Sequence, residues 1–232
     1  MSLHPNTLSL ELSGFQGSIA MMNNSGEIKT TNIQGGDREK DNIFPAIEEL
    51  SSFLEISPKE IELVVVSIGP GGFTGLRTAV AIAKMISLVS GASIVSVETA
   101  IVTVQQSNHK RGSFLVLSSV KGDQFWLSKI VKDNGHWTCN SKNSSTKTLE
   151  SEMVDIHGVF VDDFLPDGAR SIIERHEVSI YQRSPDANTL LHIGLHLYKA
   201  GRCTKPSELL PLYAREPEAV RLWQARKSSL VK

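Results

Sequence analysis

The residues whose types and spacing could do chemistry are concentrated at positions 69–77, which read GPGGFTGLR. This run follows a short apolar segment and precedes a helical pattern, and backbone N–H groups at a helix N-terminus favour an anion such as phosphate. The lysine-containing phosphate loop is not met, because Leu76 and Arg77 follow Gly75 where that loop needs lysine and a hydroxyl residue. The dinucleotide fingerprint G-x-G-x-x-G is not met either, because Gly75 falls too late.

Two interpretations of the glycine run follow. In the first, Gly71, Gly72 and Thr74 form a degenerate nucleotide loop. In the second, which the physics of the sequence favours, the glycines build a tight turn between a buried strand and a closely packed helix, because glycine allows positive φ and close approach. Thr74 is then the expected N-cap of the helix.

Other groups of reactive side chains point to ordinary surface. His192 and His196 have the i,i+4 spacing of zinc ligands, but Ile, Gly and Leu stand between them where H-E-x-x-H has a glutamate. An acidic cluster and a basic C-terminal run have solvated charge as their commonest meaning, although the basic run could also contact a nucleic-acid backbone. The clusters are Asp162, Asp163 and Asp167, and Arg215, Arg221, Arg226, Lys227 and Lys232. We therefore predict no catalytic residue and no metal site.

The composition excludes several classes of protein. With 232 residues, 40% of them hydrophobic and 21% charged, the chain is long enough for one large core or two modest ones. A formal net charge of -1 gives no global cationic field of the kind that dominates non-specific nucleic-acid binding. The N-terminus lacks a signal-peptide pattern, and Glu62 and Lys84 interrupt the longest apolar stretches, so no membrane span is expected. Cys139 and Cys203 have no metal-ligand spacing, and we expect them to stay reduced in a soluble cytoplasmic protein.

The elements that must position these residues form a mixed α/β pattern, with the architecture duplicated in two halves. A polar, basic break at 108–113 gives the predicted domains 1–108 and 109–232, with the option that the last helix packs back on the first domain. Strands are predicted over 7–13, 17–23, 26–34, 63–68, 93–97, 114–120, 123–131 and 158–165, helices over 41–54, 75–90, 99–107 and 186–201, and a polar loop over 140–148.

The helix over 75–90 carries more apolar residues than the single stripe that a helix on a sheet needs. Helix 41–54 likewise places Phe44 and Phe53 off its main stripe. A second apolar face either packs inside the protein or meets another protein, and the sequence leaves both options open. The apolar residues of the longer helix are Ala79, Val80, Ile82, Ala83, Met85, Ile86 and Val89.

Taken together, these segments resemble the TsaB (YeaZ) family, the dimerisation subunit of the bacterial machinery that makes threonylcarbamoyladenosine in tRNA. The family hallmark GPGSFTGLR is similar to residues 69–77, and DNIFPAIEELSSFL at 41–54 resembles the family's first long helix. KGDQFW at 121–126 resembles its second-domain hairpin, and LLPLYAR at 209–215 its P-x-Y-L-R ending. The resemblance covers most of the chain.

The resemblance implies an actin-like ATPase fold, with two ribonuclease-H-like lobes and a degenerate nucleotide site. It implies no catalytic role, a TsaD-like catalytic partner, a further TsaE-like ATPase and no more than weak ATP or ADP binding at the subunit interface. The uncovered apolar face predicts a homodimer when the partner is absent, and the net charge of -1 predicts that tRNA is contacted only indirectly. The partner would dock on helices of the first lobe. The interface residues that the resemblance implies are Phe44, Ile47, Arg77, Ala79, Ile82, Ala83 and Ile86.

The chain departs from the family pattern at three places. Glu11 in LELSG stands for the aspartate of I-D-T-S, Lys40 stands near the family's histidine, and Ser118-Ser119-Val120 stands for D-A-R. A competing interpretation is an actin-fold enzyme, either an ATP-dependent kinase or a glycoprotease-like metallopeptidase. The peptidase would need histidines on helix 41–54, which has none, and the kinase would need a second carboxylate beside Glu11 to hold magnesium.

Overall fold

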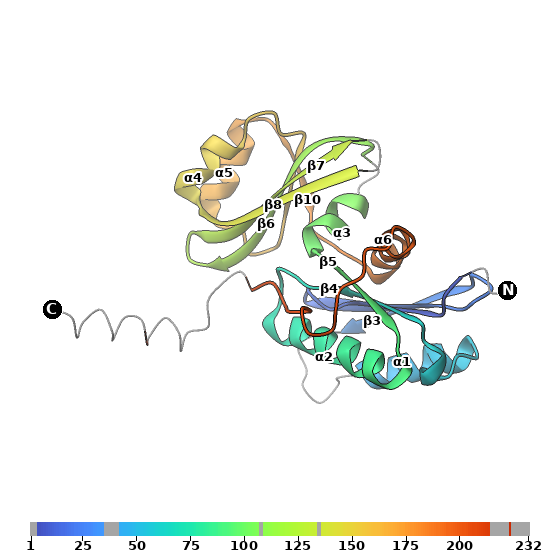
Figure 1. The fold of residues 1–232 in the computed structure, drawn as a ribbon. Coiled ribbons are helices and arrows are strands. Elements are labelled where there is room, and N and C mark those ends of the chain that lie inside the picture. The colour runs from blue at the N-terminus through green and yellow to red at the C-terminus, as the bar shows by residue number, and fades with distance from the viewer. Residues whose placement is uncertain (1–3, 35–41, 107–108, 134–135, 214–222, 224–232) are drawn as a thin grey trace.

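The computed structural model describes residues 4–34, 42–106, 109–133, 136–213 and 223, and contains two five-stranded sheets with helices packed on them (Figure 1). The sheets lie one above the other, with α3 (Thr99–Gln106) and α6 (Ala187–Lys199) between them. We call the part built on the first sheet lobe one and the part built on the second sheet lobe two.

The sheet of lobe one has the strand order β3-β2-β1-β4-β5. The first three strands form an antiparallel meander, and β4 and β5 continue the sheet parallel to β1. Every residue of β1 and β4 is buried, as expected for central strands covered on both faces. The strands are β1 (Thr7–Glu11), β2 (Gln16–Met22), β3 (Ile28–Gln34), β4 (Leu63–Ser67) and β5 (Ser93–Val97).

The sheet of lobe two repeats this topology. Its order is β10-β9-β6-β7-β8, in which β6, β7 and β8 form the antiparallel meander and β9 and β10 run parallel to β6. The strands are β6 (Arg111–Lys121), β7 (Gln124–Asp133), β8 (His136–Ser145), β9 (Gly158–Val161) and β10 (Ser179–Gln182). The predicted fold class, two lobes with mixed sheets and flanking helices, is confirmed.

The outer face of each sheet carries two helices (Figure 1). In lobe one these are α1 (Ile43–Phe53) and α2 (Phe73–Ser90), and the short helix η2 (Pro58–Glu60) leads from α1 to β4. In lobe two they are α4 (Thr146–Glu152) and α5 (Asp167–Arg175).

The two middle helices each cover the sheet of the opposite half of the chain. Helix α6 follows the strands of lobe two but packs on the sheet of lobe one, where its Ala187 carbonyl accepts a hydrogen bond from the Ser9 hydroxyl at 2.8 Å. A Cβ at Gly194 would lie 2.3 Å from Val65, so glycine lets α6 approach β4 closely. Helix α3 belongs to the first half of the sequence and packs on β6, β7 and β8.

Two details of the predicted elements are wrong. The polar loop expected at 140–148 is the end of β8 and the start of α4, because β8 is an edge strand whose pairing with β7 supplies its hydrogen bonds. Helix α2 begins at Phe73, two residues earlier than expected, with Gly72 and not Thr74 as its N-cap. Lys40 and the predicted domain boundary at 108 lie outside the described residues.

Candidate functional site

The glycine turn, residues 69–75, is packed against the turn between β1 and β2. The Gly72 N–H donates to the Ser13 carbonyl at 2.7 Å. A Cβ at Gly71 would lie 2.3 Å from that carbonyl oxygen, and one at Gly75 would lie 2.0 Å from the Leu12 carbonyl oxygen. Only glycine allows this approach, so the glycines have a packing reason that does not depend on any ligand.

Gly71, Gly72 and Thr74, the predicted nucleotide residues, lie together at the exposed start of α2. One of the donors that a phosphate would use, the Gly72 N–H, is already bonded within the chain. The Thr74 carbonyl accepts a hydrogen bond from the Thr78 hydroxyl at 3.0 Å, which is ordinary helix geometry. The assignment of these residues to a nucleotide stays a prediction.

Arg77 is held on the surface by two aromatic rings at the start of α2. Its guanidinium lies 3.9 Å from the centroid of the Phe73 ring, and its Nε donates to the Tyr213 hydroxyl at 2.9 Å. The Phe73 and Tyr213 rings are 5.2 Å apart. The Leu212 N–H donates to the Ile68 carbonyl at 2.7 Å, so the C-terminal segment is bonded beside the glycine turn. In the sequence, the only indication of this contact is the resemblance of residues 209–215 to the family's ending.

Helix α2 faces the sheet of lobe one with the side chains that the sequence assigned to a partner. Ala79, Ile82, Ala83 and Ile86 are buried in the core of lobe one, so their assignment to the contact surface is corrected. The opposite side of the helix exposes Met85, Leu88 and Val89, with Leu88 at 87% exposure. The error arose because α2 is apolar nearly all round, which leaves the inner face undetermined by periodicity.

Helix α1 exposes two rings on the same outer face of the lobe. Phe44 is 58% exposed and Phe53 is 57% exposed, with the Lys29 ammonium 4.0 Å from the centroid of the Phe53 ring. Ile47 is half-buried and packs against the core. Of the predicted interface residues, Phe44 and Arg77 are therefore exposed and Ile47 is partly so.

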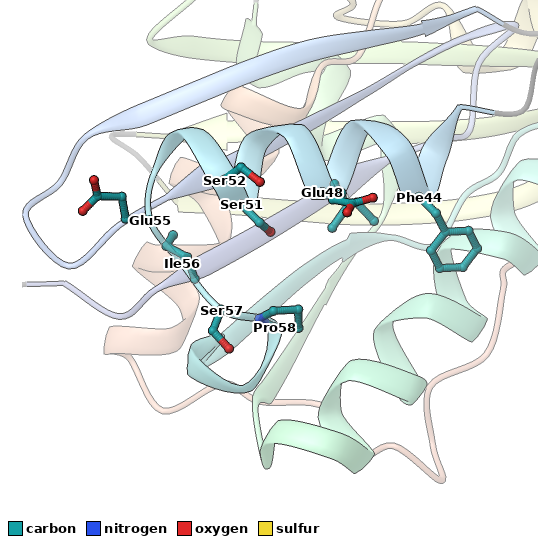
Figure 2. A pocket seen from close by; sticks show the side chains of 9 residues that line it. Phe44, Glu48, Ser51, Ser52, Glu55, Ile56, Ser57 and Pro58 are labelled. Carbon is teal, nitrogen blue, oxygen red and sulfur yellow. The ribbon is translucent and has the colours of Figure 1, made fainter.

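A groove of 590 Å³ runs along α1 and the turn that follows it. Figure 2 shows Phe44, Glu48 and Ser52 on α1, with Ser57 and Pro58 on the turn. Glu48 and Glu55 are the acidic residues among those that line it. The complete lining is Phe44, Ile47, Glu48, Ser51, Ser52, Glu55, Ile56, Ser57 and Pro58.

The polar residues that depart from the family pattern lie at the carboxyl ends of the first strands of the two sheets. Glu11 is 1% exposed, and its Oε1 accepts from the Ser13 N–H at 2.9 Å, whereas its Oε2 has no hydrogen-bond partner. Burial raises the pKa of the Glu11 carboxyl, and neighbouring polar groups and the charge of Arg183 act against that rise. The Ser118 hydroxyl accepts a hydrogen bond from Arg183.

The remaining candidates behave as surface or structural residues. His192 and His196 are exposed on α6, and the described part of the chain contains no cluster of three potential metal ligands. Asp162 accepts from the N–H and hydroxyl of Ser119 at 2.7 and 2.6 Å, so it ties two strand ends together. Helix α2 has the length and apolarity of a membrane span, but its inner face packs in the core of lobe one. The basic residues from Arg215 onward lie outside the described residues.

Comparisons with known proteins find similarity to proteins of tRNA threonylcarbamoyladenosine biosynthesis. A family model described as TsaD, tRNA N6-adenosine threonylcarbamoyltransferase, matches residues 36–133. The tRNA threonylcarbamoyladenosine biosynthesis protein TsaB of Buchnera aphidicola subsp. Baizongia pistaciae is 32% identical over 117 residues, which cover 48% of this chain and 53% of that protein. TsaB of Escherichia coli is 24% identical over 186 residues, covering 75% of this chain and 79% of the relative. The match therefore spans about half the length of the Buchnera relative and more of the Escherichia coli one.

Solved structures show the same fold. The crystal structure of a Pseudomonas aeruginosa protein described as similar to the peptidase YEAZ aligns with a TM-score of 0.74 at 16% identity, covering 91% of this chain and 100% of that one. A structure described as YeaZ from Pseudomonas aeruginosa aligns with a TM-score of 0.72 at 15% identity, covering 90% and 100%. At such identities the likeness concerns the fold alone.

Proposed function

From its similarity to TsaB proteins, we propose that the chain is a non-catalytic subunit that binds and activates TsaD in the N6-threonylcarbamoylation of adenosine in tRNA. The complex would be cytoplasmic and tRNA would be contacted through the partner. A TsaE-like ATPase is a further candidate component. A weak ATP or ADP contact at Gly71, Gly72 and Thr74 belongs to the same proposal.

The observation that carries the proposal is the apolar outer face of lobe one. Besides Phe73, whose ring contacts Arg77 at the start of α2, five large apolar side chains on α1 and α2 are exposed by 46% or more of their surface. Monomeric proteins rarely leave such a group of side chains uncovered unless it meets another molecule. We call these residues and the groove beside them the docking surface: Phe44, Phe53, Met85, Leu88 and Val89.

The chemistry of the docking surface defines what a partner must offer. The exposed rings and aliphatic side chains need an apolar counterpart, which would supply most of the affinity. The groove adds the carboxylates of Glu48 and Glu55 at its edge, so a basic side chain beside an apolar anchor would be complementary. Without TsaD, a second copy of the chain could cover the apolar part but would place like carboxylates near one another.

The first experiment is gel filtration with light scattering of the chain mixed with its cognate TsaD, with and without ATP and magnesium. A new one-to-one species is expected, and Leu88→Asp should weaken its formation by at least about tenfold, because a charge would be buried in an apolar contact. The matched control is Ser171→Asp, which adds the same charge to the exposed side of α5 in lobe two. This control should bind as the unaltered chain does.

Two results would contradict the proposal. If Leu88→Asp and Ser171→Asp bind TsaD equally well, the docking surface is not on lobe one. If the chain ignores TsaD but hydrolyses ATP alone, the actin-fold kinase replaces the accessory subunit as the better interpretation.

A further inference from the structure

One side chain connects lobe two to the glycine turn of lobe one. Arg183 directly follows β10, and its backbone N–H donates to the Val161 carbonyl at the end of β9 at 2.8 Å. Its guanidinium donates from Nη1 to the Ser118 hydroxyl at 2.7 Å and from Nη2 to the Pro70 carbonyl at 2.9 Å. Ser118 and Val161 belong to lobe two, whereas Pro70 lies in the glycine turn, 113 positions away from Arg183 in the sequence.

The charge of Arg183 is matched by one carboxylate from each lobe. Burial lowers the pKa of the guanidinium, while Glu11 of lobe one and Asp162 of lobe two raise it. Glu11 is fully buried and leaves Oε2 without a hydrogen bond. The positive charge of Arg183 favours the ionised form of Glu11, although burial and the neighbouring serine groups have larger effects on the Glu11 pKa.

The hydrogen bond from Arg183 helps to fix the position of the glycine turn and of the helix that follows it. The Gly69 carbonyl of this turn accepts a hydrogen bond from the Thr99 N–H at 2.9 Å. Two further contacts follow along the turn: Arg183 donates to the Pro70 carbonyl, and the Gly72 N–H donates to the Ser13 carbonyl. Helix α2 begins at Phe73, immediately after these two contacts. A planar guanidinium with two bonded arms fixes direction as well as distance, which a point charge does not.

We propose that Arg183 is an interlobe positioning residue, which holds the glycine turn and the first turn of α2 in a fixed place relative to lobe two. Glu11 and Ser118, which depart from the family pattern, are then two supports of one contact and not two separate losses. The inference concerns the chain by itself and goes beyond the proposed binding of TsaD. Its test therefore uses no partner.

The test is hydrogen exchange, followed by mass spectrometry, on the full chain. Removing Arg183 alone would leave Glu11 buried without that positive charge, so the informative variant is the neutral pair Glu11→Gln with Arg183→Met. Exchange at 71–76, where the Gly72 and Leu76 amides are hydrogen-bonded, should rise about tenfold or more, because a contact that holds the turn is gone. Amides in the centres of β4 and β9 should exchange as in the unaltered chain.

Arg183→Lys separates positioning from charge. Lysine keeps a positive charge for Glu11 but lacks the two-armed fork, so we expect a melting temperature close to that of the unaltered chain together with faster exchange at 71–76. The matched control is Arg175→Met, since Arg175 pairs with Glu150 at 3.0 Å on the exposed surface of lobe two. This control should leave exchange at 71–76 unchanged.

The proposal fails if amides at 71–76 exchange as slowly in the neutral double variant as in the unaltered chain. It also fails if exchange rises equally in β4, β9 and the glycine turn, because Arg183 would then contribute to overall stability without positioning the turn. Since TsaD is absent from the experiment, neither result depends on the proposed function.

Discussion

The two lobes have the same topology, but they use different groups to connect two equivalent segments of the chain. In each lobe, the loop after the fourth strand of the sheet is tied to the end of its first strand. Lobe one uses backbone alone, with the Gly72 N–H bonded to the Ser13 carbonyl at 2.7 Å. Lobe two uses a side chain, because Asp162 accepts from the N–H and hydroxyl of Ser119. In lobe one the loop lies so close to the end of the first strand that Gly71 and Gly75 have no room for a Cβ, whereas lobe two uses a carboxylate, and so the two loops have unrelated sequences.

The helices that follow these loops differ in their outer faces. Helix α5 of lobe two buries Ala169, Ile172 and Ile173 and exposes polar and charged positions, as in an ordinary amphipathic helix. Helix α2 of lobe one buries an equivalent apolar side and also exposes Met85, Leu88 and Val89. The difference indicates that α2, unlike α5, has an apolar outer face suited to contact with another protein.

The largest expected effect is a loss of stability when a charge is placed on the buried inner face of α2 or of α5, and it should be similar in the two helices. Ala79 in α2 and Ala169 in α5 are both fully buried. Ala79→Arg and Ala169→Arg should each destabilise the fold by about 4 kcal/mol or more, because a charge would replace a methyl group in a packed core. Urea denaturation followed by circular dichroism measures this. A folded Ala79→Arg protein of unaltered stability would show that the inner face of α2 is assigned wrongly.

A smaller loss of stability should show that the connection in lobe one needs glycine, whereas the equivalent region of lobe two does not. Gly75→Ala places a Cβ 2.0 Å from a backbone oxygen and should cost about 2–4 kcal/mol. Gly168→Ala at the start of α5 meets only the Thr146 side chain, at 3.1 Å, and should change the unfolding free energy by less than about 1 kcal/mol. Thermal denaturation of both variants provides the comparison. Equal costs would mean that close approach is not what lobe one needs glycine for.

Removing the hydrogen bonds of Asp162 in lobe two should lower the unfolding free energy by somewhat less than Gly75→Ala does. Asp162→Ala removes the acceptor of two hydrogen bonds from Ser119 and one from the Phe164 N–H, and we expect a loss of about 2 kcal/mol. Asp163→Ala is the matched control, because Asp163 accepts a single exposed bond from Gln182. Its unfolding free energy, measured in urea, should stay within about 0.5 kcal/mol of that of the unaltered chain.

The smallest effect is a change in pH dependence. The pKa of Glu11 is raised in the folded chain, so its contribution to stability is greatest below its ordinary pKa and is lost as the pH rises through the folded value. Relative to the unaltered chain, Glu11→Gln should therefore gain stability as the pH increases above about 4.5. Urea midpoints between pH 4 and pH 8 measure this. A constant difference across that range would show that Glu11 does not titrate differently in the folded and unfolded states.

The sequence by itself determined most of the elements and the need for glycine at the turn. Local patterns predicted a strand, a turn and a helix to within a few residues. These patterns are the apolar run ending at Ser67, the glycines that follow and the helical pattern to Ser90. The duplicated strand pattern also gave the two-lobed fold class. Local signals misjudged residues 140–148, because a polar edge strand is recognised only by its pairing with β7.

The tertiary structure alone decided which residues face one another. Helix α2 is apolar on nearly every side, so only its packing on β4 shows that Ala79 and Ala83 are inside and Leu88 is outside. The hydrogen bond from Arg183 to the Pro70 carbonyl joins residues that are 113 positions apart and lie in different lobes, and the local sequence around each residue does not predict it. Periodicity reports how a segment folds on itself, whereas contacts between distant segments depend on how the sheets and helices assemble.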